Sequence, residues 1–138
     1  MKALKTPLRY PGGKSRACTK LATVFPNLNT YKEYREPFLG GGSVALYVTK
    51  MYPHLKVWVN DLYVPLINFW KELQYDGQAL EDTLLRHKNE NPDRETAKEL
   101  FKKSKEDINN QELSNHDRAA AFYIVNKCSF SGLTEASS

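Results

Sequence analysis

Two short glycine-containing segments and one carboxylate carry the residue types from which a ligand site could be built. Residues 10–15 (Tyr-Pro-Gly-Gly-Lys-Ser) combine an aromatic ring with a cation, and residues 36–43 (Glu-Pro-Phe-Leu-Gly-Gly-Gly-Ser) combine a carboxylate, an aromatic ring and three glycines that admit a close ligand. Asp61 follows the apolar run 57–59. A carboxylate about 20 residues beyond a glycine loop is suited to accept both hydroxyl groups of a ribose. Together these residues favour an adenosine-containing ligand.

The second segment lies between a predicted strand and a predicted helix. Residues 31–37 have the pattern of an extended segment, and residues 43–51 have apolar side chains at helical spacing. Ser43 is predicted to cap this helix, whose first N–H groups would then face a ligand above the loop. A strand–glycine loop–helix unit is a common binding element of open α/β sheets. A flexible turn is the alternative for three consecutive glycines.

The other elements must place these segments side by side. The pattern predicts a helix over 15–25, a turn over 26–30 and a strand over 56–61. Further helices are predicted over 63–75, 78–89, 93–107 and 115–127, with breaks around Gly77 and at Asn91-Pro92. Two strands, each followed by a helix, indicate part of a parallel α/β sheet with a helical cluster in the C-terminal half.

The composition restricts the class of protein. The chain has 138 residues, of which 41% are hydrophobic and 26% charged, as expected for one soluble domain. No apolar run approaches the roughly 20 residues that span a bilayer and no signal-peptide pattern opens the chain, so we expect a cytoplasmic protein without membrane contact. Cys18 and Cys128 lack neighbours at metal-ligand spacing, which predicts reduced thiols and no metal. The net charge of +4 is compatible with a polyanionic partner but does not require one.

Several of these residues have an alternative interpretation. Gly13-Lys14-Ser15 matches the end of a phosphate-binding P-loop, but Leu8 occupies the position of its first glycine, which disfavours that interpretation; a plain N-terminal turn is another alternative. Asp61 could cap the helix that begins near Tyr63. Phe38 could pack on an adenine or a thioether, or simply in the core.

Four motifs in one order resemble the family of DNA adenine-N6 methyltransferases typified by the bacterial Dam enzymes. They occupy residues 8–14, 36–44, 59–61 and 122–133, and so cover essentially the whole chain. The resemblance implies a Rossmann-like class I methyltransferase sheet, the cofactor S-adenosylmethionine and double-stranded DNA as partner. It also implies that residues 1–76 form the cofactor-binding α/β half of a single domain and that 77–138 form a helical, DNA-facing part.

The resemblance also implies two sets of site residues. Many relatives have Trp at the position of Tyr10, a change that keeps ring stacking with less area. The alternative for the residues implied to bind DNA is that they end a helix and pack in the core. The positions implied to bind the cofactor are Tyr10, Gly12, Gly13, Lys14, Glu36, Pro37, Phe38, Gly40 and Asp61, and those implied to bind DNA are Asn126, Lys127 and Phe130.

One motif of the family is missing from this sequence. The family holds the target amino group with an Asp-Pro-Pro-Tyr segment, and neither this nor its Asn or Ser variants occurs here. We therefore expect no catalytic residue in this chain and no methyl transfer by it alone, activity requiring a C-terminal remainder or a separate partner chain. An incomplete sheet would leave an open strand edge and apolar helix faces exposed. A non-catalytic DNA-binding remnant is the alternative function.

Overall fold

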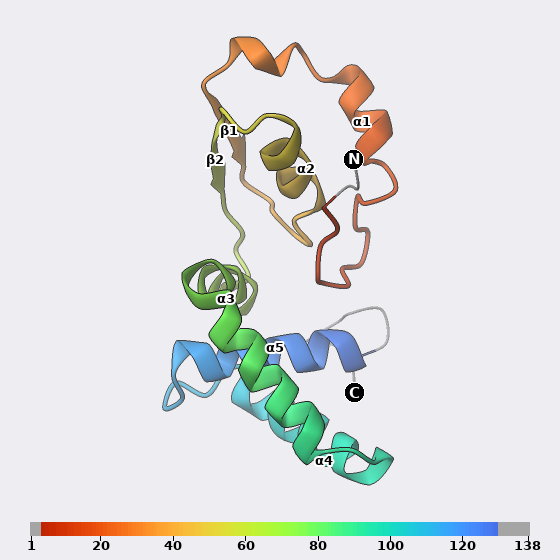
Figure 1. The fold of residues 1–138 in the computed structure, drawn as a ribbon, viewed down its shortest axis with the longest axis vertical. Coiled ribbons are helices and arrows are strands. Elements are labelled where there is room, and N and C mark those ends of the chain that lie inside the picture. The colour runs from red at the N-terminus through yellow and green to blue at the C-terminus, as the bar shows by residue number, and fades with distance from the viewer. Residues whose placement is uncertain (1–3, 130–138) are drawn as a thin grey trace. The chain divides into compact units, whose positions relative to one another are not determined.

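The structure, a computed structural model, describes residues 4–129. It divides into two compact units, unit 1 (Met1–Leu62) and unit 2 (Tyr63–Ser138), which are described separately (Figure 1). Unit 1 contains α1, a short 3-10 helix η1, β1, α2 and β2, and unit 2 contains α3, α4 and α5. In chain order the bounds are α1 (Cys18–Val24), η1 (Leu28–Thr30), β1 (Glu33–Glu36), α2 (Ser43–Met51), β2 (Lys56–Val59), α3 (Val64–Glu90), α4 (Arg94–Asp107) and α5 (Asn115–Cys128).

Unit 1 is built around two parallel strands. β1 pairs with β2 in a register that sets Glu33 opposite Lys56 and Glu36 opposite Val59. Parallel pairing requires a crossover, which α2 supplies. The buried side chains of the hydrophobic core of unit 1 are Leu28, Val44, Val48 and Leu55, and those packed against them are Cys18, Leu21, Phe25, Tyr34, Tyr47, Tyr52 and Val57. The carboxyl ends of both strands therefore lie at one edge.

The ends of the elements in unit 1 differ from the predicted ones. α1 begins at Cys18, because the preceding residues form a turn in which the Ala17 N–H donates to the Lys14 carbonyl over 2.9 Å. The predicted cap of α2 was wrong: Gly42 occupies the N-cap position with a φ of 77°. A positive φ favours glycine there, so Ser43 becomes the first helical residue. Its hydroxyl instead pairs with the Ser15 hydroxyl at 2.8 Å.

Unit 2 is helical, and its breaks follow the local sequence. The two helices predicted on either side of Gly77 are joined as α3, which kinks at Asp76 (φ −151°, ψ 78°). The Asp76 carboxylate accepts from the Ala79 N–H at 3.0 Å and so restarts the helix. Asp93 caps α4 through the Thr96 N–H at 2.9 Å, and Ser114 caps α5. The predicted helices at 93–107 and 115–127 are thus confirmed to within a residue or two.

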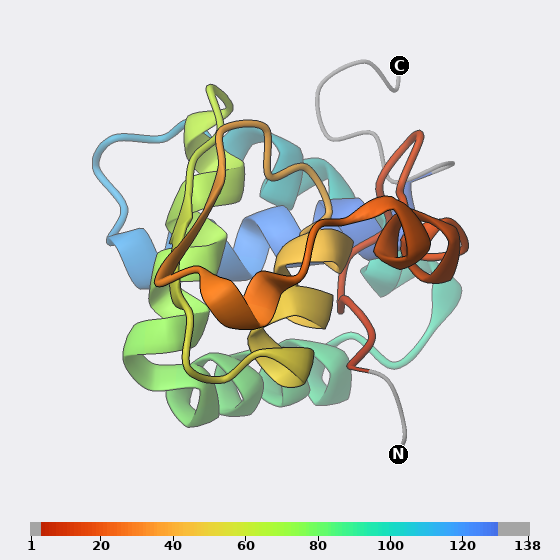
Figure 2. The same ribbon diagram turned by 90° about the horizontal axis from the view of Figure 1, so that it is seen from above.

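The core of unit 2 is aromatic. α5 packs against α3 and α4 (Figure 2). Phe69 of α3 stacks on Tyr123 of α5 with ring centroids 5.8 Å apart and contacts Phe122 at 5.6 Å. The small residues Ala119, Ala120 and Ala121 are buried and allow the close approach of α5. These contacts explain why the first turns of α3 belong to unit 2.

The predicted α/β class and the helical C-terminal half are confirmed. The predicted division after residue 76, however, falls inside α3, whereas the structure divides between Leu62 and Tyr63. Trp58 and Val59 of β2 are exposed, as expected for an open sheet edge. Among residues 4–129 there is no group of three or more side chains that could hold a metal ion, and none of the helices is long and apolar enough to cross a membrane.

Candidate functional site

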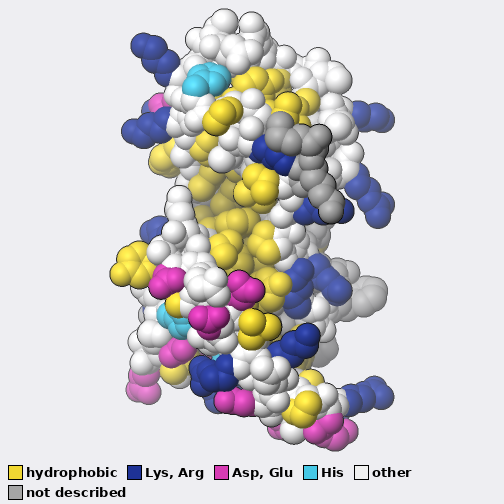
Figure 3. All heavy atoms as spheres, viewed as in Figure 1, with side chains coloured by type: hydrophobic (Ala, Val, Ile, Leu, Met, Phe, Trp, Pro, Cys, Tyr) yellow, Lys and Arg dark blue, Asp and Glu magenta, His cyan; other side chains and the backbone are white. Residues whose placement is uncertain are grey.

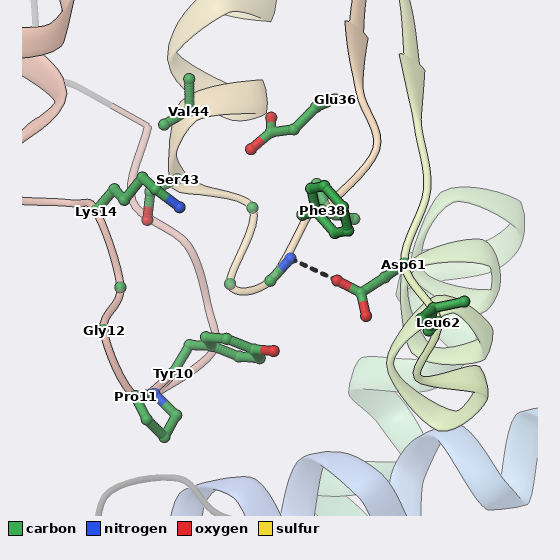
Figure 4. A pocket seen from close by; sticks show the side chains of 15 residues that line it. Tyr10, Pro11, Gly12, Lys14, Glu36, Phe38, Ser43, Val44, Asp61 and Leu62 are labelled. Atoms are coloured by element: carbon green, nitrogen blue, oxygen red, sulfur yellow. Dashed lines mark hydrogen bonds between the residues drawn. The ribbon is translucent and has the colours of Figure 1, made fainter.

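Hydrogen bonds continue the pairing of the strands beyond their carboxyl ends. The Asn60 N–H donates to the Glu36 carbonyl at 2.9 Å, and the Leu39 N–H donates to the Asn60 carbonyl at 2.8 Å. The Gly40 N–H then donates to Oδ2 of Asp61 at 2.9 Å (Figure 4). The glycine loop is thereby fastened to the residues that follow β2. Asp61 does not cap α3, whose N-cap is Tyr63, so that alternative was wrong.

The N-terminal loop lies against the glycine loop. Its residues 10–13 form a tight turn in which the Gly13 N–H donates to the Tyr10 carbonyl at 3.0 Å, and Gly12 has a φ of 68°. A Cβ on Gly41 would lie 2.9 Å from the Tyr10 Cβ, and one on Gly40 would lie 3.1 Å from its ring. Glycine is therefore required for Tyr10 to pack where it does. The hydroxyl pair of Ser15 and Ser43 joins the same two loops.

These loops enclose a cavity of about 310 Å³. It lies entirely within unit 1, and Figure 4 shows side chains from the N-terminal loop, the end of β1 and the end of β2 around it. Eight of the nine predicted cofactor positions line it, namely Tyr10, Gly12, Gly13, Lys14, Glu36, Phe38, Gly40 and Asp61. Pro37 is exposed and is not among the lining residues. The structure thus brings together residues separated by up to 51 positions.

Two apolar side chains at the rim are unusually exposed. Phe38 has 75% of its surface exposed, so the core-packing alternative for this residue was wrong. Leu62 is 88% exposed and also lines the cavity. Leu62 was not predicted as a site residue, although its place directly after Asp61 was a usable signal. Exposed apolar surface at a cavity rim is typical of a binding site.

The charged side chains of the cavity influence one another. Burial raises the pKa of Glu36, and a hydrogen bond from Tyr34, the Lys14 ammonium and the Ala45 N–H partly offset this rise. Burial together with the Asp61 charge raises the pKa of Tyr10, which keeps its hydroxyl protonated at neutral pH. The cavity thus presents two carboxylates, one ammonium group and the first N–H groups of α2. Such a set suits a ligand that carries both positive and negative groups.

The P-loop alternative is not supported by the fold. A P-loop runs from a strand directly into a helix, and its Ser would be a magnesium ligand. Within the described part of the chain no strand precedes Gly13, and α1 begins only at Cys18. The Ser15 hydroxyl is paired with Ser43.

Two of the predicted DNA-facing residues, Asn126 and Lys127, belong to α5 of unit 2. Asn126 is buried within α5, with 1% of its surface exposed, because it faces the core beside Val125. This burial favours the core alternative for Asn126, and its contact with DNA stays a prediction. Lys127 is partly exposed, and its Nζ lies 5.5 Å above the Tyr123 ring. Phe130 lies outside the described residues.

The net charge of the chain conceals a division between the units. The first 62 residues contain ten Lys and Arg but three Asp and Glu, and no acidic residue precedes Glu33. The rest of the chain contains ten Lys and Arg and thirteen Asp and Glu. On the face shown in Figure 3, acidic side chains gather on unit 2. This division was not predicted, although a separate charge count for each half of the sequence reveals it.

Comparison with known proteins identifies the family. A type II methyltransferase of Methanocaldococcus jannaschii is 30% identical over 94% of this chain and 47% of its own length. A type II methyltransferase of Lactococcus lactis subsp. cremoris is 26% identical over 94% of the chain and 43% of its own length. A DNA N-6-adenine-methyltransferase of Escherichia phage P1 is 33% identical over 91% of the chain and 15% of its own length. The chain therefore spans less than half the length of these relatives. The model of the D12 class N6 adenine-specific DNA methyltransferases matches residues 10–138, and the chain belongs to that family.

Proposed function

We propose that the cavity of unit 1 binds S-adenosylmethionine and that the chain forms the cofactor-binding part of an enzyme that methylates the N6 amine of adenine in double-stranded DNA. The observation that carries this proposal is the convergence of Tyr10, Glu36, Phe38 and Asp61 on one cavity at the carboxyl ends of two parallel strands. Ligands of Rossmann-like sheets bind at that edge. Membership of the methyltransferase family supports the same conclusion.

The donor set of the cavity fits each part of this cofactor. Asp61, beyond the second strand, is suited to the ribose hydroxyls, and the exposed ring of Phe38 is suited to stack on a flat base. Lys14 and the first N–H groups of α2 are suited to a carboxylate, and Glu36 to an ammonium group. A volume of about 310 Å³ is at the lower end of the range for small-molecule sites. S-adenosylmethionine, when bound, supplies the activated methyl group.

We propose that the residues of this chain bind and orient the cofactor, and that residues outside it form the pocket for the target adenine. An enzyme that reacts with a base in a duplex turns that base out of the stack into a pocket. Positioning of the amine against the methyl donor then provides much of the rate enhancement. Because the sequence contains no Asp-Pro-Pro-Tyr segment, we propose that the isolated chain transfers no methyl group. A C-terminal remainder or a partner chain would supply the missing pocket.

Double-stranded DNA as the partner is supported by the charge of unit 1. Arg16 and Lys20 are exposed and lie in a part of the sequence without acidic residues. Clustered exposed cations bind the phosphate backbone through release of counterions. We therefore assign the main phosphate-binding surface to unit 1, with Lys127 of unit 2 as a further candidate.

Calorimetric titration of the purified chain with S-adenosylhomocysteine tests the cofactor proposal. We expect saturable binding to the parent chain and a loss of roughly tenfold in affinity for Asp61→Ala, since a hydrogen bond to a charged group contributes on the order of 1.5–3 kcal/mol. Asp82→Ala is the matched control, because Asp82 is an exposed carboxylate of α3 remote in sequence from every lining residue. Equal binding by all three proteins, or binding of magnesium-ATP instead, would contradict the proposal.

A further inference from the structure

Tyr34 connects the hydrophobic core of unit 1 to the wall of the cavity. It lies two residues before Glu36 on β1, and side chains at that spacing point to the same face of a strand. Its ring packs against the core cluster, and its hydroxyl donates to Oε2 of Glu36 over 3.2 Å. Glu36 lines the cavity, whereas Tyr34 does not. The Tyr34 hydroxyl therefore reaches a ligand in the cavity through Glu36.

The groups around the Glu36 carboxylate come from several elements, and the Tyr34 hydroxyl is the hydrogen-bond donor that β1 supplies. Lys14 approaches from the N-terminal loop, the Cys18 thiol from α1 and the Ala45 N–H from α2. Burial and the charge of Glu36 raise the pKa of Tyr34, so its hydroxyl stays protonated and remains a donor at neutral pH. The ring is held by the core, which fixes the position of the donor.

The arrangement of the cavity indicates which part of the ligand Glu36 meets. The ribose is assigned to Asp61, at the end of the other strand. Lys14 and the first turn of α2, both close to Glu36, are suited to a carboxylate (Figure 4). In an α-amino acid the carboxylate and the ammonium group are attached to one carbon, so a carboxylate held there brings the ammonium group next to Glu36.

We propose that Tyr34 is a positioning residue whose hydroxyl holds the Glu36 carboxylate in the orientation that receives the α-ammonium group of the cofactor. The proposal rests on the function proposed for the cavity and adds a residue that does not itself touch the ligand. A glutamate has several rotatable bonds, and ordering it only on binding would reduce affinity. The core of unit 1 pre-orders it through Tyr34.

Two ligands separate this proposal from a general effect on the cavity. S-adenosylhomocysteine carries the α-ammonium group, whereas 5′-methylthioadenosine has the same adenosine and thioether without the amino acid. We expect Tyr34→Phe to weaken binding of the first by roughly three- to tenfold, the effect of one hydrogen bond. The affinity for 5′-methylthioadenosine should change by less than about twofold, because a substitution that removes no contact to a ligand has only a small effect. Tyr47→Phe is the matched control, because Tyr47 packs against the same core cluster and does not line the cavity.

A second variant and the pH profile test whether Tyr34 acts through Glu36. In the Glu36→Gln background, Tyr34→Phe should produce no further loss of affinity for S-adenosylhomocysteine. Loss of the hydroxyl also raises the pKa of Glu36, so affinity should begin to fall at a higher pH on acidification than in the parent chain. A purely structural role for Tyr34 would not move this pH. Thermal melting of each variant establishes that it is folded.

The outcomes distinguish failure of the proposed function from failure of the role proposed for Tyr34. If the parent chain binds neither ligand, the proposed function fails and the role of Tyr34 fails with it. If the parent chain binds both ligands but Tyr34→Phe has no effect, or weakens both equally, only the role of Tyr34 is overturned. A full effect of Tyr34→Phe in the Glu36→Gln background overturns it as well.

Discussion

Asp61 accepts a hydrogen bond from the backbone N–H of Gly40 at 2.9 Å, across 21 positions of the sequence. This bond joins the end of β2 to the loop that follows β1. The cavity wall is therefore held partly by a contact within the chain itself. We propose that the same carboxylate binds the ribose. Its replacement should therefore affect both the stability of the chain and its affinity for the ligand.

Replacement of Asp61 is expected to reduce the stability of the chain as well as its ligand affinity. In Asp61→Ala the partly buried Gly40 N–H loses its acceptor, at a cost of about 1–3 kcal/mol in the free energy of unfolding. Asp61→Asn retains an oxygen that can accept this bond and should cost less. Urea denaturation of the three proteins measures the difference. Equal stabilities for Asp61→Ala and the parent chain would show that the bond contributes nothing.

Gly41→Ala is expected to displace Tyr10. The added Cβ would lie 2.9 Å from the Tyr10 Cβ, so one of the two loops must move, at a cost of about 1–3 kcal/mol. We expect a lower melting temperature and weaker binding of S-adenosylhomocysteine. Gly77→Ala is the control, because the nearest atom to its added Cβ is 3.5 Å away. Unchanged ligand affinity in Gly41→Ala would count against a role of Tyr10 in binding.

Charge removal is expected to weaken DNA binding more in unit 1 than in unit 2. Arg16→Ala with Lys20→Ala removes two exposed cations from the segment without acidic residues. The slope of log affinity against log salt should fall by about two, since each phosphate contact contributes about 0.9. Lys98→Ala with Lys102→Ala in α4 is the matched pair, and Lys102 already pairs with Glu99 at 3.2 Å. Fluorescence anisotropy on a duplex gives both slopes, and a larger change for the α4 pair would refute the assignment.

His87 is expected to make unit 2 less stable in mild acid. Burial and the neighbouring Arg86 lower its pKa in the folded chain from the ordinary value of 6.5. As the pH falls through 6.5 the unfolded chain takes up this proton first, so the free energy of unfolding decreases until the pH passes the lowered pKa. Above that window the contribution is constant. Urea titrations of the parent chain and His87→Asn at several pH values test this, and parallel pH profiles would contradict it.

Much of the local structure could be predicted because it depends on neighbouring residues. The helix over 43–51 and the breaks near Gly77 and at Asn91-Pro92 follow from side-chain spacing, glycine and proline. The cap of α2 could not be predicted in this way. Ser43 is a good cap by type, but Gly42 takes the position because the backbone there has a positive φ. Asn126 is polar and near a helix end, yet the packing of α5 buries it.

The sequence by itself determined the order of the motifs, the α/β class and the residue types available to a ligand. Only the tertiary structure decided that Tyr10 packs on the glycine loop, that Asp61 bonds to Gly40, and that Tyr34 reaches Glu36 from the core. The physical reason is that parallel pairing of β1 with β2 brings their carboxyl ends together. Contacts across that edge depend on register and loop path, and neither is encoded by any single stretch of the chain.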